Sequence, residues 1–244
     1  LGIKIFHMEA GLRAWDKRMP EQRNRILIDH MSNILFPFNT YHRENLIREN
    51  IHPSKIFVTG NPTFEVMRNY SDQINESKIL KKIDLNWKDY FLVTCHRSEN
   101  IDHGDSLLKL MNIFSELSKK YKKKVIFPMH PRTMKKIGKN NNFKGVEIIK
   151  PLGFYDFNKL LKNSLCVLSD SGTAPEECLF YKVANISIRY STERPETIES
   201  GGSIVSGLTK KNIFESVSLA IQKSFTAKYN FEDEHSPSSV VVNA

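Results

Sequence analysis

The sequence has few cysteines, no long apolar run and a shortage of acidic residues. Its three cysteines, Cys95, Cys166 and Cys178, are an odd number without metal-ligand spacing, which argues against a disulfide framework and favours a reducing compartment. No run reaches the roughly 18 apolar residues of a membrane-spanning helix, and the first residues lack a signal-peptide pattern. With 244 residues, 40% of them hydrophobic, we expect a folded, cytoplasmic protein without membrane attachment.

The shortage of acidic residues leaves a formal charge of +9, from 36 Lys and Arg against 27 Asp and Glu. Much of the excess lies in the lysine-rich stretches 78–88 and 119–124, which we interpret as exposed faces. No nucleic-acid-binding module accompanies them, so nucleic acid is not an expected partner. A positive field around a cleft would instead favour a small phosphorylated substrate.

Short runs rich in Val and Ile alternate with helical patterns, which is typical of an α/β fold with a mainly parallel sheet. We expect largely buried strands at 3–8, 34–38, 56–59, 91–94, 125–129, 146–149, 166–169 and 186–189. Helices are expected at 20–31, 43–49, 106–120, 154–162, 175–181 and 212–225.

The polar stretch 71–89 lies between two arrays of strands and helices, and we interpret it as a linker. It separates a first domain at 1–70 from a second at 90–226, and a polar, frayed tail is expected at 227–244. Three strands before the linker, opened by a buried strand at the first residues, are few for a doubly wound domain. We therefore expect the missing part of the first domain to lie upstream.

Polar segments follow several of these strands, where open parallel sheets bind ligands. The segment 169–177 leaves a strand and opens a helix, with Thr173 as the expected cap and Glu176 completing a capping box. Gly172 would let a phosphate approach the main chain at the helix N-terminus, and Glu177 would accept hydrogen bonds from ribose. An ordinary capped helix is an equally supported alternative.

His96 and Arg97 follow another strand, where His96 would donate a hydrogen bond or carry a proton near neutral pH. A structural histidine is the alternative. Arg189 or Arg194 would clamp a diphosphate, with a salt-bridged loop as the alternative, and His130 adds a donor at the end of the strand 125–129.

The opening residues supply two carboxylates. Glu9 ends the first strand, and Glu21 lies in the first turn of the next helix, with Asn24 and Arg25 on the same helical face. Two carboxylates in one cleft suit acid and base chemistry on a sugar. Alternatively, Glu21 only stabilises its helix and pairs with Arg25.

Together and in this order, these segments resemble the non-hydrolysing UDP-N-acetylglucosamine 2-epimerase family. The matching motifs run from residue 7 to about residue 207: His-Met-Glu-Ala-Gly-Leu-Arg at 7–13, Pro-Glu at 20–21 with Asn-Arg at 24–25, Gly-Asn-Pro at 60–62, His-Arg at 96–97 with Glu-Asn at 99–100, His-Pro at 130–131, Ser-Asp-Ser-Gly at 169–172, Glu-Glu at 176–177 and Glu-Arg-Pro-Glu at 193–196.

The resemblance implies a glycosyltransferase-B-like pair of Rossmann domains, the first incomplete here, that hold a UDP-sugar between them. The family inverts the second sugar carbon without a nicotinamide or metal cofactor, by eliminating UDP to a glucal and adding it back. Its members are typically homodimers, and the expected role is surface polysaccharide synthesis. By this resemblance, Glu9, Glu21 and His96 are catalytic. The expected substrate-binding residues are Arg13, Arg25, Arg97, His130, Phe157 on uracil, Ser171 and Gly172 on the phosphates, Thr173, Glu177 on ribose and Arg194 at the nucleotide end.

Two departures from the family pattern bear on function. The family's N-terminal strand and Gly-Thr-Arg-Pro-Glu loop have no counterpart, so roughly a hundred residues are absent by ordinary domain sizes. Our hypothesis is that the chain is a fragment that alone lacks activity and exposes part of its first domain's core.

The second departure is Thr173, where many of these epimerases have Gly. The pair Gly172-Thr173 and the sequence Phe-His-Met-Glu-Ala-Gly at 6–11 are similar to those of relatives that epimerise UDP-2-acetamido-2,6-dideoxyhexoses. Leu12 and Asn61-Pro62 instead favour UDP-N-acetylglucosamine, which we take as the expected substrate. A glycosyltransferase using the sugar as donor, and an inactive UDP-binding fragment, are the alternatives.

Overall fold

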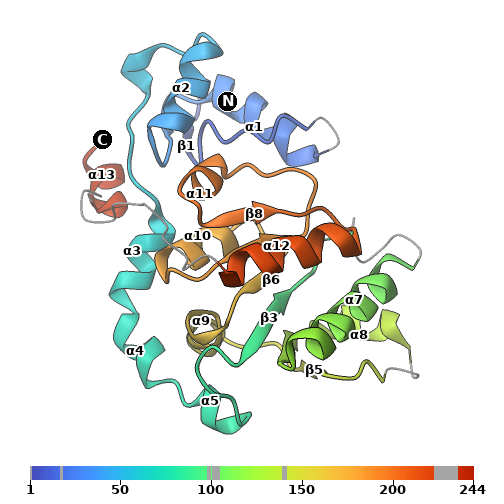
Figure 1. Cartoon of the computed structure of the whole chain (residues 1–244). Helices are drawn as coiled ribbons and strands as arrows, with labels where there is room; N and C mark the ends of the chain where they lie inside the picture. Colours follow the sequence, from blue (N-terminus) through green and yellow to red (C-terminus); the bar gives the residue numbers. More distant parts are fainter. Residues whose placement is uncertain (1, 17–18, 98–99, 101–104, 139–141, 223–235) are drawn as a thin grey trace. The chain divides into compact units, whose positions relative to one another are not determined.

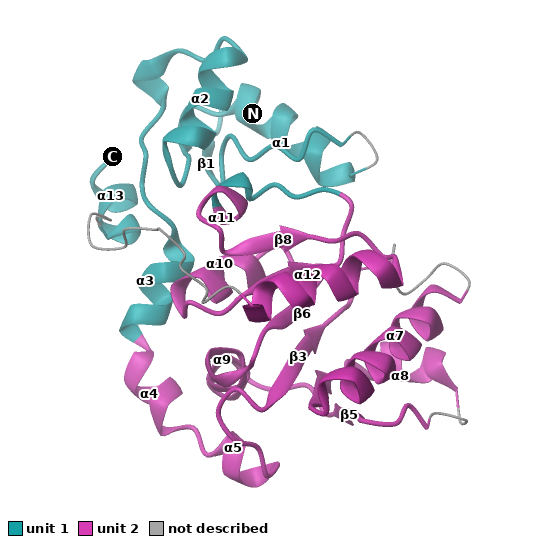
Figure 2. Ribbon diagram, viewed as in Figure 1, with its two compact units in different colours: residues 1–69, 191–196, 229–244 teal, residues 70–190, 197–228 magenta. Residues whose placement is uncertain are grey.

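A computed structural model describes residues 2–16, 19–97, 100, 105–138, 142–222 and 236–244 (Figure 1). The chain divides into two compact units (Figure 2). Unit 1 comprises residues 1–69, 191–196 and 229–244, and unit 2 comprises residues 70–190 and 197–228. Within the described ranges, every helix is too short or too polar to cross a lipid bilayer.

Unit 2 is built on a parallel sheet with the strand order β5-β4-β3-β6-β7-β8. Central strands β3, β4, β6 and β7 are almost fully buried, which explains why the sequences of β3, β4 and β6 are largely apolar. Numbered along the unit, the order is 3-2-1-4-5-6, that of a Rossmann domain. The strands are Tyr90–Thr94 (β3), Lys124–Pro128 (β4), Val146–Ile149 (β5), Val167–Ser169 (β6), Asn185–Ser187 (β7) and Ser203–Val205 (β8).

Helices cover both faces of this sheet. On one face, α7 (Ser106–Tyr121) buries Leu110, Phe114 and Leu117, an apolar stripe at helical spacing, in one core cluster. On the other face, α9 (Phe154–Asn163) contributes Leu160 and Leu161 to a second cluster. The remaining helices are α4 (Ser71–Glu76), α5 (Ile79–Lys82), α8 (Pro131–Ile137), α10 (Ala174–Phe180), α12 (Lys210–Gln222) and α11 (Pro195–Glu199), whose first two residues belong to unit 1.

Unit 1 has a two-stranded parallel sheet of β1 (Phe6–Met8) and β2 (Ile34–Phe36), to which Leu35 and Ile56 add an isolated bridge. A small core gathers Leu35, Leu46 and Ile56. The helices are α1 (Pro20–Met31), α2 (Thr40–Arg48), the 3-10 helix η1 (Pro53–Lys55), α3 (Pro62–Asn69) and α13 (Pro237–Asn243).

The prediction of a buried first strand is wrong. Phe6 and Met8 of β1 are 54% and 43% exposed, because β1 pairs with β2 alone in this two-stranded sheet. On the neighbouring helix α1, Leu27 and Met31 are also exposed, at 63% and 69%. The strand expected at 56–59 is reduced to the single bridge at Ile56, and β8 was not predicted.

The polar stretch interpreted as a linker contains the helices α4 and α5, which both contact α9 within unit 2. Ile74 and Ile79 are buried there, and Ser77 Oγ donates a hydrogen bond to Asp156 Oδ1 at 2.5 Å. At the chain end, residues 227–235 lie outside the described residues. The frayed end expected beyond them is wrong, because α13 forms there with the Ser236 side chain accepting a capping hydrogen bond. Helix α12 ends at Gln222, and the predicted helical residues 223–225 are not described.

Candidate functional site

The strand order of unit 2 creates a topological switch point between β3 and β6, which lie side by side (Figure 1). Ligands of doubly wound sheets bind beyond the carboxyl ends of such strands. Here those ends are Thr94 and Ser169, paired in register. The predicted segments 94–100 and 169–177 therefore leave the sheet next to each other.

A buried carboxylate, Asp170, joins these two segments. Its side chain is inaccessible to solvent and accepts hydrogen bonds from the main-chain N–H groups of His96 (3.0 Å) and Arg97 (3.0 Å). Cys95 Sγ and Asn100 Nδ2 also donate to it, each at 3.0 Å. Several donors to one carboxylate stabilise its charged form in a buried position. Asp170 thus fixes the loop that follows β3.

This loop presents His96 outward. The His96 side chain is 59% exposed, and its Nδ1 lies 3.6 Å from Asp170 Oδ1. Arg97 Nε donates to the main-chain oxygen of Asp170 at 2.8 Å, whereas Asn100 is buried and bridges Asp170 to the Ile188 carbonyl. Glu99 of the predicted motif lies outside the described residues. The geometry leaves the His96 ring accessible while its main chain is anchored.

The segment that opens α10 differs from its predicted capping. The Thr173 side chain makes no capping hydrogen bond, and Glu176 is buried, so the predicted capping box is wrong. Instead, the Ser171 hydroxyl accepts the Thr173 N–H at 3.3 Å, and Ser169 Oγ accepts the Ser171 N–H at 2.9 Å. The serines supersede the box because their hydroxyls lie two residues from the N–H groups they bind, as in a tight local turn. Ser171 and Gly172 remain partly accessible at this corner.

Three further predicted residues lie in unit 2. Partly exposed Glu177 has its pKa raised to about 7, first by burial and then by repulsion from Glu176. His130 is exposed two residues after the end of β4. Phe157 of α9 is partly buried and packs against the core cluster on that face of the sheet. A carboxyl group that titrates near neutral pH is a feature of functional sites.

In unit 1, the carboxylate of Glu9 lies between two arginines. Arg25 NH2 is 3.4 Å from Glu9 Oε2, and Arg194 NH2 is 3.2 Å from Glu9 Oε1. Glu21 is exposed in the first turn of α1, four residues before Arg25 and therefore on the same helical face. Arg25 thus contacts Glu9 and lies one helical turn from Glu21.

Arg194, expected at the nucleotide end, is 2% exposed and is paired with Glu9. Its guanidinium carbon lies 5.8 Å from the centroid of the Phe38 ring, a cation–π arrangement. Glu196 on the same segment approaches His42, with Oε2 and Nε2 3.5 Å apart. Within unit 1, the segment 191–196 therefore contacts the segments that carry Glu9 and His42, and one of these contacts reaches a predicted catalytic carboxylate.

Arg13, expected to bind substrate, is fully buried. Its Nε donates to Glu49 Oε1 at 2.7 Å, and its NH2 donates to Asp29 Oδ2 at 2.7 Å. This environment favours a structural role over the direct substrate contact that was predicted. Asp29 is a residue that sequence reasoning missed. Its only sequence signal is its position on α1, four residues after Arg25 and eight after Glu21.

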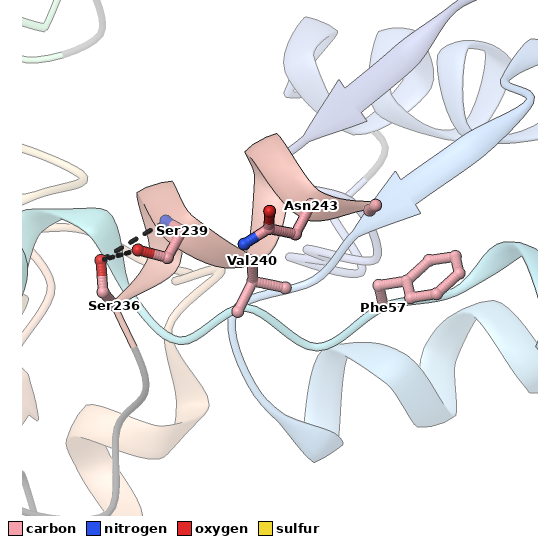
Figure 3. Close-up of a pocket in the computed structure, with 6 residues that line it drawn as sticks. Phe57, Ser236, Ser239, Val240 and Asn243 are labelled. Carbon is pink, nitrogen blue, oxygen red and sulfur yellow. Dashed lines mark hydrogen bonds between the residues drawn. The ribbon is translucent and has the colours of Figure 1, made fainter.

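A hollow of about 490 Å³ lies elsewhere in unit 1, beside α13 (Figure 3). Val240 and Asn243 of α13 line it together with Phe57. Its lining contains none of the predicted site residues, which separates it from the candidate site.

Known proteins resemble this chain in sequence and in architecture. The family model for UDP-N-acetylglucosamine 2-epimerase matches residues 1–241. The protein of Methanococcus maripaludis named UDP-N-acetylglucosamine 2-epimerase is 38% identical, and the match covers all of this chain and 69% of that protein. The Methanocaldococcus jannaschii protein of the same name is 37% identical, and the match covers 99% of this chain and 68% of that protein. The chain therefore spans about two thirds of these relatives.

Solved structures give the same result. The Methanocaldococcus jannaschii UDP-GlcNAc 2-epimerase in complex with UDP-GlcNAc and UDP has a TM-score of 0.89 at 35% identity, over 99% of this chain and 68% of that chain. The Neisseria meningitidis enzyme bound to UDP-GlcNAc has a TM-score of 0.86 at 28% identity, over 99% and 69%. The expected α/β fold class is confirmed. Together with the motifs at the switch point and around Glu9, these matches show that the chain belongs to the UDP-N-acetylglucosamine 2-epimerase family of isomerases.

Proposed function

We propose that this protein interconverts UDP-N-acetylglucosamine and UDP-N-acetylmannosamine by eliminating UDP and adding it back. The observation that carries the proposal is the Rossmann switch point of unit 2, where Asp170 holds His96 beside the Ser171-Gly172 corner. The relatives named for this activity, two of them with UDP-GlcNAc bound, support the same substrate.

The reaction begins with removal of the proton on the second sugar carbon by a base. The electron pair of that C–H bond forms a double bond between the first and second carbons, and the bond from the first carbon to the diphosphate oxygen breaks with its electrons leaving on UDP. A proton is then delivered to the second carbon from the opposite face. UDP adds back to the first carbon, which restores the glycosidic bond and completes the inversion.

We assign the proton transfers to Glu9, Glu21 and His96. Two carboxylates and a histidine provide separate donors and acceptors for the two faces of the sugar. Glu9 is oriented by Arg25 and Arg194, and Glu21 lies one helical turn before Arg25 on α1. Orientation of this kind matters because the C–H proton is weakly acidic and its removal requires a base in the correct place.

We assign nucleotide binding to unit 2. Ser171 and the main-chain N–H of Gly172, with Thr173 beside them, would meet the phosphates, while Arg97 and His130 add donors for the departing diphosphate. Glu177 would accept hydrogen bonds from ribose, and Phe157 would pack on uracil. Retention of UDP after it departs requires this set to bind it tightly.

The test is incubation of the 244-residue chain with UDP-N-acetylglucosamine in deuterium oxide, followed by NMR and mass spectrometry of the sugar. The proposal expects UDP-N-acetylmannosamine with one deuterium at the second carbon, a result that would contradict the earlier hypothesis that this chain alone lacks activity. Glu21→Gln should reduce turnover by at least about 100-fold, the scale of a lost acid or base, with UDP affinity by calorimetry within about twofold. Transfer or hydrolysis without deuterium, or binding of UDP without any exchange, would refute the proposal.

A further inference from the structure

Asp29 on α1 is a buried carboxylate with three donors and no part in the proposed chemistry. It is 1% exposed, and His7 Nδ1 lies 2.6 Å from its Oδ1. Its Oδ2 accepts from Arg13 NH2 at 2.7 Å and from the Gly11 N–H at 3.2 Å. Burying a charged carboxylate is costly unless several hydrogen bonds compensate it. Asp29 therefore needs the donors on the segment 7–13, and that segment is held in place by Asp29.

These donors lie on both sides of Glu9. His7 precedes it by two residues, and Gly11 and Arg13 follow it by two and four residues. Asp29 therefore forms hydrogen bonds to the chain before and after Glu9, the proposed catalytic carboxylate. The Glu9 carboxylate itself contacts Arg25 and Arg194.

The backbone conformation of Glu9 explains why the residues around it need these hydrogen bonds. Glu9 has φ of 64°, in the left-handed region that costs a non-glycine residue about 1–2 kcal/mol. A strained residue keeps its conformation only when its surroundings fix it. Asn45 Nδ2 adds to the fixation by donating to the Gly11 carbonyl at 2.9 Å, and Glu49 pairs with Arg13.

We propose that Asp29 is a positioning residue, which holds Glu9 in register with the reactive groups on α1. Arg25 lies one turn before Asp29 on that helix, and Glu21 lies two turns before it. A single helix therefore connects Asp29 to both Arg25 and Glu21. The inference rests on the proposed function. Asparagine has one acceptor oxygen in place of two, so it can keep either the donors Arg13 and Gly11 or a donating His7 Nδ1, but not all three.

The test compares Asp29→Asn with Glu44→Gln, a control on the exposed side of α2 whose carboxylate contacts Arg43. Asp29→Asn should reduce kcat about 10- to 100-fold, the cost of a misplaced group, while KM changes less than about twofold. Glu44→Gln should leave both constants unchanged. Wild-type kcat in Asp29→Asn, or a loss that appears in KM instead, would overturn the proposal. If Asp29→Asn does not fold, His7→Gln removes only one donor to Asp29. It should also lower kcat with KM nearly unchanged, and the loss of kcat should be smaller than for Asp29→Asn.

A second measurement does not depend on turnover. In protein labelled with ¹³C-glutamate, the side-chain carboxyl resonance of Glu9 should move in Asp29→Asn and stay in place in Glu44→Gln. An unmoved Glu9 resonance overturns the positioning role even when the wild type is inactive. Absence of deuterium incorporation by the wild type refutes the proposed function alone, so the two failures are distinguishable.

Discussion

Replacement of Gly11 by alanine tests the packing of the loop that carries Glu9. Gly11 has φ of 75°, and a Cβ at this position would lie 2.1 Å from the main-chain oxygen of His42. The left-handed conformation costs about 1–2 kcal/mol for alanine. Because the obstructing atom belongs to the backbone of α2, the loop must shift, which adds about 1–3 kcal/mol as in other overpacked sites. We therefore expect Gly11→Ala to lower the free energy of unfolding of unit 1 by about 2–5 kcal/mol, the sum of these two costs.

Gly201→Ala is the matched control, because Gly201 has φ of 79° but nothing within 4 Å of the added Cβ. It should lose only the conformational part, about 1–2 kcal/mol. Urea unfolding followed by circular dichroism gives both values, and hydrogen exchange of the peptides around residues 5–15 assigns the first loss to unit 1. Equal losses in the two variants would show that the contact with His42 costs nothing and would refute the argument.

Two further predictions concern unit 2. The folded-state pKa of Glu177 is raised from 4.5 to about 7, so the folded protein should gain stability as pH falls through 7. Glu177→Gln should therefore be more stable than wild type at pH 8, with the difference closing below about 4.5, and a constant difference in urea midpoints across this range would contradict the assignment. Asp170→Asn leaves buried donors from the loop of His96 without their charged acceptor, and we expect a loss of about 3 kcal/mol. A loss below about 1 kcal/mol in urea unfolding would show that Asp170 does not anchor the loop.

Local sequence signals predicted most elements of the fold. The helix at 20–31 was predicted with its observed bounds, because Pro20 starts it and Asn33 and the apolar run of β2 follow closely. The helices α7 and α9 were predicted to within one residue, since their apolar residues recur at helical spacing. The strands β3 to β6 were likewise visible as short apolar runs.

The sequence prediction missed the strand β8, the 3-10 helix η1 and the helices α3, α4, α5, α8, α11 and α13. Two of these, α4 and α5, depend on contacts rather than on local pattern. α4 and α5 are short and polar, and only Ile74 and Ile79 are buried in them, against a helix that lies about 80 residues later. β8 contains only two apolar residues, Ile204 and Val205, after Ser203 and a pair of glycines, so no apolar run marks it. The exposed β1 shows the opposite error, since an apolar run predicts a buried strand only when other elements cover it.

For the candidate site, the sequence predicted which loops matter but not what holds them. His96 and Glu9 were expected from their positions at strand ends, and both lie there. Asp29 and Asp170 could not be assigned their roles in the same way, because a carboxylate's donors lie far away in sequence: 16 to 22 residues for Asp29 and 70 to 75 for Asp170. Sequence spacing alone does not show which distant donors a carboxylate will contact.

The two units solve one physical problem in the same manner. A loop that leaves a parallel strand has main-chain N–H groups without partners in the sheet, and these must be satisfied if the loop is to keep one conformation. In each unit a buried aspartate from another element accepts them: Asp29 accepts from Gly11, and Asp170 accepts from His96 and Arg97. The aspartate carboxylates are buried, whereas the side chains of Glu9 and His96 at the strand ends stay accessible to solvent. Since an amide cannot accept from so many donors, the carboxylates themselves, rather than residues of similar size, are what this arrangement requires.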